Sequence, residues 1–323
     1  MRVLIVKTSS MGDVVHCLPV VADVARARPQ AQVDWVVEEA FAEIPGMHPA
    51  VARVIPVALR RWRRNPWDRA TWREARLALR GLRERRSDLI VDCQGLIKSA
   101  MVAAGARGPV CGPAASCARE PLAALFYGRR LRVDPALHAV ERNRRLCALA
   151  AGYALDGPEV FGVRERAAQL AAPASCDGQG AVLLFTNASR ASKRWPDDRW
   201  VALESALAQQ GRASWLAWGT AQEREDCARR VERMRAARLL PPTTLAQIAA
   251  LASRAALAVG LDTGLTHLAA AVGVPTVGIF CDYDTARVGL RGAGAARSLG
   301  GVGQTPEVRA VLDAAAAVLE TAA

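Results

Sequence analysis

Short apolar runs rich in β-branched residues alternate with stretches of helical periodicity along most of the chain. This alternation is typical of parallel sheets whose strands are joined by crossover helices. We expect a first series of buried strands at residues 2–6, 33–37, 53–57 and 88–93, with helices at 14–27, 72–86 and 139–151. Pro19 lies inside the first expected helix, so that helix either begins late or kinks there.

The pattern restarts after Gly157-Pro158 and the stretch PASCDGQG at 173–180. A second series of strands is expected at residues 181–185, 213–218, 237–241, 257–262 and 275–280. The sequence therefore predicts an α/β protein of two doubly wound, Rossmann-like domains, residues 1–170 and 171–323, whose last helix, at about 306–321, could pack on either half. Ligands of such folds bind at the carboxyl ends of the strands, so we expect a shared central cleft.

Composition agrees with this plan. The 323 residues suffice for two ordinary domains, and the 51% hydrophobic and 23% charged content fits a soluble globular protein. The apolar run at 3–6 is interrupted by Lys7 and is too short for a signal peptide or a membrane span, which predicts a cytoplasmic protein. Eight scattered cysteines without a CxxC pair, and four separated histidines, predict reduced thiols and no structural metal site.

The formal net charge of +12 comes almost entirely from arginine, since only Lys7, Lys98 and Lys193 are lysines. Residues 53–86 hold twelve arginines against three carboxylates, which predicts an acidic partner. Residues 59–74, LRRWRRNPWDRATWRE, interleave arginine with tryptophan. Such a segment suits single-stranded nucleic acid, carboxylated sugars, an anionic membrane or merely solvent. No RNP sequence, zinc finger or helix-turn-helix supports nucleic acid.

The first candidate motif is KTSSMGDVVHCLP at residues 7–19, between the first strand and the first helix. Small residues at the start of a helix resemble an anion cradle. The GxGxxG fingerprint is absent, which disfavours a nicotinamide dehydrogenase. Asp13 is either a helix N-cap or a general base that takes a proton from an incoming hydroxyl.

The second motif, GLDTGLTHLAAA at 260–271, follows an apolar strand and opens an alanine-rich helix. Asp262, Thr263 and Gly264 supply a turn with free amides, and Thr266 and His267 lie in the first helical turn. Such a terminus suits a diphosphate. The alternative is a capped helix whose histidine faces solvent.

Two further segments follow strands of the second half. In TNASRASKRWP at 186–196, Lys193 is a candidate phosphate ligand, with Asn187 and Ser189 as neutral donors, although a solvated surface lysine is the alternative. In WGTAQERE at 218–225, Glu223 either accepts hydrogen bonds from ribose hydroxyls or complements a helix dipole.

Together the segments at 7–16, 92–100, 118–127, 138–144, 193–196 and 262–271 resemble the bacterial lipopolysaccharide heptosyltransferases, glycosyltransferase family nine. The resemblance covers nearly the whole chain, and the motifs occur in the family's order. Within the family, KTSSMGD is similar to the branch that adds the first heptose. One departure is the loop before Lys193, where family members carry a histidine and two threonines and this chain has Thr186, Ala188 and Ser189.

The resemblance implies a GT-B fold with the acceptor bound mainly by the first domain and the nucleotide sugar by the second. It implies metal-independent, inverting transfer of L-glycero-D-manno-heptose from ADP-heptose to the first Kdo of Kdo2-lipid A, with Asp13 as base and Lys193 as phosphate-binding cation. The donor side would comprise Thr186, Asn187, Ser189, Lys193, Glu223, Asp262, Thr263, Gly264, Leu265 and His267. The acceptor side would comprise Ser9, Ser10, Gly12, Arg60, Arg61, Arg63, Lys98 and Arg119.

We therefore expect no cofactor and no metal, ADP-heptose being a substrate. The Asp282-Tyr283-Asp284 segment has the spacing of a metal-holding Asp-x-Asp pair, and we expect it to be a loop. We also expect a monomer without a nucleic-acid partner, peripheral on the anionic cytoplasmic face of the inner membrane. The alternatives are a GT-B transferase that uses another nucleotide sugar or adds a later core heptose, and a basic nucleic-acid-binding protein.

Overall fold

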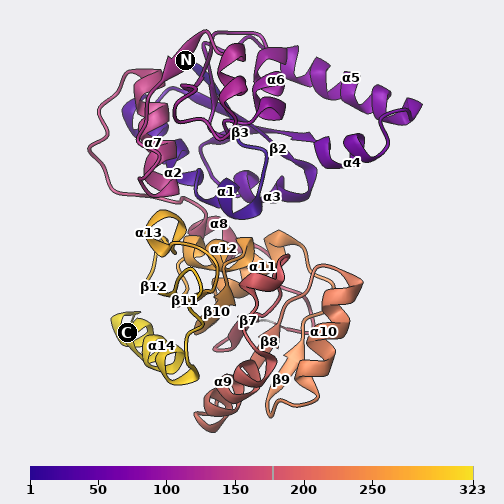
Figure 1. Ribbon diagram of the computed structural model, residues 1–323, viewed down its shortest axis with the longest axis vertical. Coiled ribbons are helices and arrows are strands. Elements are labelled where there is room, and N and C mark those ends of the chain that lie inside the picture. Colours follow the sequence, from indigo (N-terminus) through magenta and orange to yellow (C-terminus); the bar gives the residue numbers. More distant parts are fainter. Residues whose placement is uncertain (177, 323) are drawn as a thin grey trace. The chain divides into compact units, whose positions relative to one another are not determined.

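The computed structural model describes residues 1–176 and 178–322 and divides into two compact units, Met1–Gly162 and Val163–Ala323. Each unit contains one six-stranded sheet with helices around it (Figure 1). The predicted α/β class is confirmed. The contact boundary precedes the predicted one near residue 170, so that α8 (Arg164–Gln169) is grouped with the second unit, where it packs on α11 and α12.

The first sheet has the strand order β3-β2-β1-β4-β5-β6, and all of its pairings are parallel. Its strands are β1 (Arg2–Val6), β2 (Gln32–Glu38), β3 (Val51–Val57), β4 (Leu89–Asp92), β5 (Val110–Pro113) and β6 (Arg129–Leu131). Its helices are α1 (Met11–Val15), α2 (Leu18–Ala27), α3 (Glu43–Gly46), α4 (Leu59–Arg64), α5 (Arg69–Arg83), α6 (Ile97–Gly105) and α7 (Ala139–Ala151), with short 3₁₀ turns at Glu39–Phe41 and Pro121–Phe126.

Proline determines how the first crossover helix begins. The expected helix at 14–27 is two helices, because α1 ends at Val15 and α2 begins at Leu18 with Pro19 in its first turn. A proline is tolerated there since the first amides of a helix have no intrahelical acceptor. The expected single helix is thus interrupted at residues 16–17, and only its second part begins late enough to hold Pro19 in a first turn.

The second sheet has the order β12-β11-β10-β7-β8-β9 and is likewise parallel. Its strands are β7 (Val182–Phe185), β8 (Ser214–Leu216), β9 (Ala237–Leu239), β10 (Leu257–Leu261), β11 (Thr276–Phe280) and β12 (Ala296–Gly300). Its further helices are α9 (Asp197–Gln209), α10 (Ala221–Val231), α11 (Leu245–Ala252), α12 (Gly264–Val272), α13 (Thr285–Val288) and α14 (Val308–Ala322), with a 3₁₀ turn at Ala191–Lys193. The last helix packs on β11, β12 and α9 of this unit.

Each sheet reverses its strand order beside its first strand, and this places the candidate residues. β1 lies between β2 and β4, and β7 lies between β8 and β10. The residues that follow these strands lie at the edge where doubly wound sheets bind ligands. Within the described residues, no helix combines the length and the apolarity that crossing a membrane requires.

Candidate functional site

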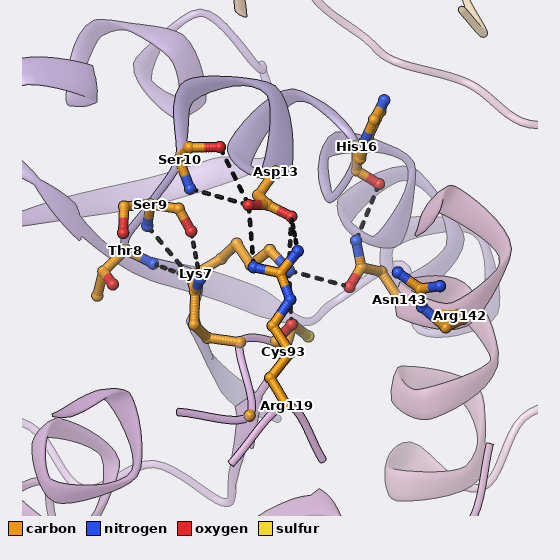
Figure 2. A network of polar contacts seen from close by, with 12 residues as sticks. Lys7, Thr8, Ser9, Ser10, Asp13, His16, Cys93, Arg119, Arg142 and Asn143 are labelled. Atoms are coloured by element: carbon orange, nitrogen blue, oxygen red, sulfur yellow. Dashed lines mark hydrogen bonds and ion pairs between the residues drawn. The ribbon is translucent and has the colours of Figure 1, made fainter. Parts of the chain in front are cut away.

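The loop after β1 is built around a buried lysine (Figure 2). Lys7 is 5% exposed, and its Nζ donates to the Cys93 carbonyl oxygen at 2.7 Å and to Asn143 Oδ1 at 3.4 Å. The ammonium also lies 4.0 Å from Asp13 Oδ1. A buried charge is tolerated only with such partners. Lys7 thus ties the loop to β4 and α7 and brings a fixed positive charge to Asp13.

Asp13 receives hydrogen bonds from two directions. Ser10 donates to Oδ2 through its amide at 3.0 Å and its hydroxyl at 3.1 Å. Arg119 donates to Oδ1 at 3.2 Å and to Oδ2 at 3.4 Å. Burial opposes ionisation of this carboxyl, but Lys7, Arg119 and Ser10 outweigh burial and hold its pKa below the ordinary value. The carboxylate is therefore ionised at neutral pH and able to accept a proton.

The structure also corrects the capping alternative for Asp13. Ser10 is the N-cap of α1, and Asp13 is the third helical residue, whose carboxylate accepts from the N-cap amide. This is half of a capping box. Since a cap needs only one oxygen lone pair, it does not account for the ion pairs with Arg119 and Lys7.

The other predicted residues of this loop lie around the same carboxylate. Lys98 Nζ donates to Ser9 Oγ at 3.4 Å, which brings the start of α6 to the loop. Gln94 accepts from the amides of Thr8 and Ser9 and donates to the Ser9 carbonyl oxygen. Gly12 lies in α1, beside Asp13. The prediction thus places Ser9, Ser10, Lys98 and Arg119 in one polar cluster, and the structure brings them together.

The arginines of α4 are held at the same edge of the sheet. The Arg60 amide donates to Glu38 Oε1 at the end of β2, and its guanidinium lies 5.3 Å from the centre of the Phe41 ring. Arg61 bridges Glu39 and Glu74 at 3.0 and 2.7 Å. Arg63 is exposed. Two of the three predicted acceptor arginines are therefore positioned by internal partners.

In the second unit, Lys193 is paired and is not a solvated surface lysine. Its Nζ donates to Asp262 Oδ2 at 2.6 Å and lies 4.4 Å from the centre of the Tyr283 ring. Asp262 Oδ1 contacts His267 Nε2 at 3.3 Å. Burial opposes ionisation of Asp262, but His267 and Lys193 lower its pKa. The segments after β7 and β10 thus meet in one charged cluster.

The start of α12 lies within this cluster. Its first amides, at Gly264 and Leu265, have no intrahelical acceptor, and no side chain among the described residues caps them. Thr266 Oγ1 donates to the Leu261 carbonyl oxygen at 2.6 Å, and Thr263 Oγ1 lies 3.3 Å from Thr266 Oγ1. His267 is only 3% exposed, so the alternative of a solvent-facing histidine is wrong. Free amides beside an ammonium can bind a phosphate.

Two of the predicted hydroxyl and amide donors serve the interior instead. Thr186 is 1% exposed, and its Oγ1 accepts from Arg230 Nη1 at 3.3 Å. Asn187 Oδ1 accepts from the same guanidinium at 3.0 Å, and its Nδ2 donates to the Ala217 carbonyl oxygen at 3.3 Å. Ser189 is exposed. Of these three side chains, that of Ser189 is therefore the one open to a ligand.

Glu223 has a structural role whatever else it does. Its Oε2 accepts from the amides of Gly219 and Thr220 at 2.8 and 3.1 Å, and Thr220 Oγ1 accepts from the Glu223 amide at 3.2 Å. This capping box begins α10. A ribose contact through the second carboxylate oxygen stays a prediction.

The Asp-x-Asp segment is occupied by other contacts. Asp282 Oδ2 accepts from Ser192 Oγ at 2.7 Å, and Asp284 caps α13 through the Ala286 amide at 2.9 Å. Across the described residues, no group of three or more histidine, cysteine or acidic side chains could hold a metal ion. All eight cysteines are free thiols.

Sequence reasoning did not assign Lys7, Asn143, Arg230 or Tyr283 to the site. The scarcity of lysine, which singled out Lys193, applies equally to Lys7. Asn143 and Arg230 carry no such signal, because they reach the clusters only through contacts between distant parts of the chain.

Two doubly wound units, with polar clusters after their first strands, define the GT-B class of glycosyltransferases. The model of glycosyltransferase family 9 (heptosyltransferase) matches residues 75–312, and the chain belongs to this family. It is 45% identical over 282 residues, 87% of this chain and 78% of the relative, to lipopolysaccharide heptosyltransferase 1 of Pseudomonas aeruginosa.

Solved structures agree with this assignment. E. coli heptosyltransferase WaaC with ADP superposes with a TM-score of 0.89 at 36% identity, covering 97% of this chain and 98% of that one. The same enzyme with ADP-2-deoxy-2-fluoro heptose gives a TM-score of 0.86 at 35% identity and covers both chains completely, 100% and 100%.

Proposed function

We propose that this protein transfers L-glycero-D-manno-heptose from ADP-heptose to the first Kdo of Kdo2-lipid A, with inversion and without a metal ion. The observation that carries the proposal is the 45% identity to lipopolysaccharide heptosyltransferase 1 of P. aeruginosa along most of both chains. The proteins solved with ADP and with a fluorinated ADP-heptose support the donor. The protein would work as a monomer, peripheral on the cytoplasmic face of the inner membrane.

Inversion requires a base on one side of the anomeric carbon and stabilisation of the leaving diphosphate on the other. Asp13 suits the base because it is ionised and 15% exposed. A positioned base contributes roughly 10²- to 10⁴-fold to the rate. The acceptor hydroxyl would lose its proton to Asp13 as its oxygen bonds to the anomeric carbon, while the bond from that carbon to the ADP oxygen breaks.

Lys193 and the first amides of α12 suit the diphosphate. One well-placed donor contributes about 10²- to 10³-fold to the rate when charge develops on a leaving oxygen. Asp262 Oδ2 holds the Lys193 ammonium at 2.6 Å and so fixes its position. Lys193 and the amides would supply the positive charge that a divalent ion supplies in metal-dependent sugar transferases.

The test is ADP release from ADP-heptose with Kdo2-lipid A present, with it absent, and with excess chelator. Asp13→Asn should cut turnover by at least about 10²-fold and leave donor binding nearly unchanged, because an amide can still accept the cap hydrogen bond but cannot take a proton. Asp134→Asn is the matched control, since Asp134 caps a turn through the Ala136 amide at 2.8 Å. If Asp13→Asn turns over as fast as the parent, Asp13 is not the base. If activity is lost in excess chelator, the transfer requires a metal ion.

A further inference from the structure

The exposed face of α5 carries a row of arginines that, among the described residues, form no ion pair and no side-chain hydrogen bond, although the charge of Arg73 helps to lower the pKa of Glu74. These are Arg69, Arg73, Arg76 and Arg80. Spacings of three and four residues place them on one face of the helix, while Thr71 and Leu82 are buried on the opposite face. Within the described part of the chain, none of the four makes an ion pair or a side-chain hydrogen bond. Neighbouring like charges repel, so this face favours an external anion.

The nearby carboxylates are already engaged elsewhere. Asp68 caps α5 through the Ala70 amide at 3.0 Å. Glu74 accepts from Arg61 and Trp62 at 2.7 and 3.1 Å, and Glu84 accepts from Arg53 at 2.6 Å. These three are the only acidic residues among positions 53–86, against twelve arginines. The positive charge of the row is therefore not neutralised within its own segment.

Exposed tryptophans accompany the row. Trp67, in the loop between α4 and α5, is 91% exposed, and Trp72 is 57% exposed. Figure 1 places this loop at the margin of the first unit. A tryptophan favours the boundary between water and an apolar phase, because its ring is apolar and its N–H needs a polar partner.

We propose that α5 and the loop before it dock the protein on a bilayer that bears anionic phospholipid. The arginine row would contact headgroup phosphates, and Trp67 and Trp72 would enter the layer beneath them. A single helix face suits a flat charged surface, whereas single-stranded nucleic acid binds in grooves with stacking platforms. The docking surface differs from the acceptor arginines of α4, and it deepens the proposed function by naming the segment that contacts the membrane.

The experiment is co-sedimentation with vesicles that contain neither Kdo2-lipid A nor donor, so its outcome does not depend on catalysis. One set is phosphatidylcholine, and the other adds phosphatidylglycerol. The protein should bind the anionic set preferentially and dissociate as salt is raised, because salt screens exposed charges. Arg69→Gln, Arg73→Gln, Arg76→Gln and Arg80→Gln combined should lower the partition coefficient by about 600-fold if the four contributions are additive, since each basic residue contributes about fivefold.

The matched control has the same change in net charge elsewhere on the chain. It combines the substitutions Arg130→Gln, Arg235→Gln, Arg238→Gln and Arg297→Gln, all at exposed positions, and it should bind as the parent does. Replacing the four α5 arginines by lysine should preserve most binding. Both glutamine variants should melt like the parent and process a lipid-free Kdo acceptor at the parent's rate.

Three outcomes would overturn the proposal. The first is equal vesicle binding by the α5 variant and its control. The second is binding only when the vesicles contain Kdo2-lipid A, which would make the row part of the acceptor site. The third is saturable binding of single-stranded RNA through these arginines without binding to vesicles.

Discussion

Asp13 combines burial, which weakens ionisation, with two cations, which strengthen it, and the cations win. A base with a lowered pKa is ionised over a wide pH range but takes a proton less readily. The guanidinium of Arg119 is the more movable of the two cations, since its side chain is 52% exposed and that of Lys7 is 6% exposed. Lys7 lowers the pKa of Asp13 more than Arg119 does, but Arg119 is the cation whose removal disturbs the interior less.

Arg119→Gln should raise the pKa of Asp13, because it removes a positive charge that lies 3.2 Å from the carboxylate. If ionised Asp13 is required, the acid limb of the kcat/KM profile should move to higher pH. Arg119→Lys, which keeps the charge, should move it less. The measurement is kcat/KM at saturating donor from about pH 4 to pH 8, a range that spans the ordinary carboxyl and imidazole pKa values. If the acid limb of the kcat/KM profile does not move in Arg119→Gln, Arg119 does not control the ionisation of Asp13.

The positions of Asp13 and Lys193 after strands were predictable because apolar periodicity locates strand ends. What each side chain contacts was not predictable. Asp262 forms hydrogen bonds with both Lys193 and His267. Arg230 donates hydrogen bonds to Thr186 and Asn187. Such pairings depend on how distant segments pack, and the residue types alone do not specify them.

At the scale of elements, Glu223 belongs to the capping box that stabilises α10 and is also a predicted ribose contact. Thr220→Ala and Glu223→Ala each remove one half of the box, so each should destabilise the second unit by about 1 kcal/mol. If Glu223 contacts ribose, Glu223→Ala alone should also raise the donor KM by about tenfold, the cost of losing a charged hydrogen bond. Thermal melting and donor kinetics on both variants separate the two roles. Equal KM values would leave Glu223 with the cap alone.

Long periodic segments were predictable, and short strands were less so. The helix expected at 139–151 is α7, Ala139–Ala151. The strands β5, β6 and β12, with sequences VCGP, RRL and ARSLG, were not predicted. β6 and β12 are edge strands, paired on one side only, and their partly exposed residues lack an apolar run. Glycine and proline likewise weaken the strand pattern of β5.

At the scale of the whole molecule, the two units should respond differently to acid. Asp13 in the first unit and Asp262 in the second both have lowered pKa values, so each contributes stability that is lost as pH falls below about 4, the ordinary carboxyl range. His48 belongs to the first unit and acts at higher pH. Burial lowers its pKa to about 4.

The environment of His48 explains why it resists protonation. The ring is 4% exposed, and its Nδ1 accepts from the Ala50 amide at 3.2 Å. Its Nε2 is buried without a hydrogen-bond partner among the described residues. A proton on Nδ1 would displace the Ala50 amide and leave a charge in an apolar place.

The sign of the resulting pH dependence follows from linkage. In the unfolded chain the histidine has a pKa of about 6.5 and binds a proton more readily than the folded chain does. Stability of the first unit should therefore be constant above about pH 6.5 and fall by about 2 kcal/mol between pH 6.5 and pH 5. His48→Asn should remove most of this fall, because asparagine can accept the same amide hydrogen bond two residues ahead but does not titrate. Hydrogen exchange, corrected for its intrinsic rate at each pH, would follow β1 in the first unit and β10 in the second. As the pH falls, the opening free energy of β1 should fall in the parent and much less in His48→Asn, while that of β10 should be the same in the two proteins. If the opening free energy of β1 falls equally in the parent and in His48→Asn, groups other than His48 control the acid response.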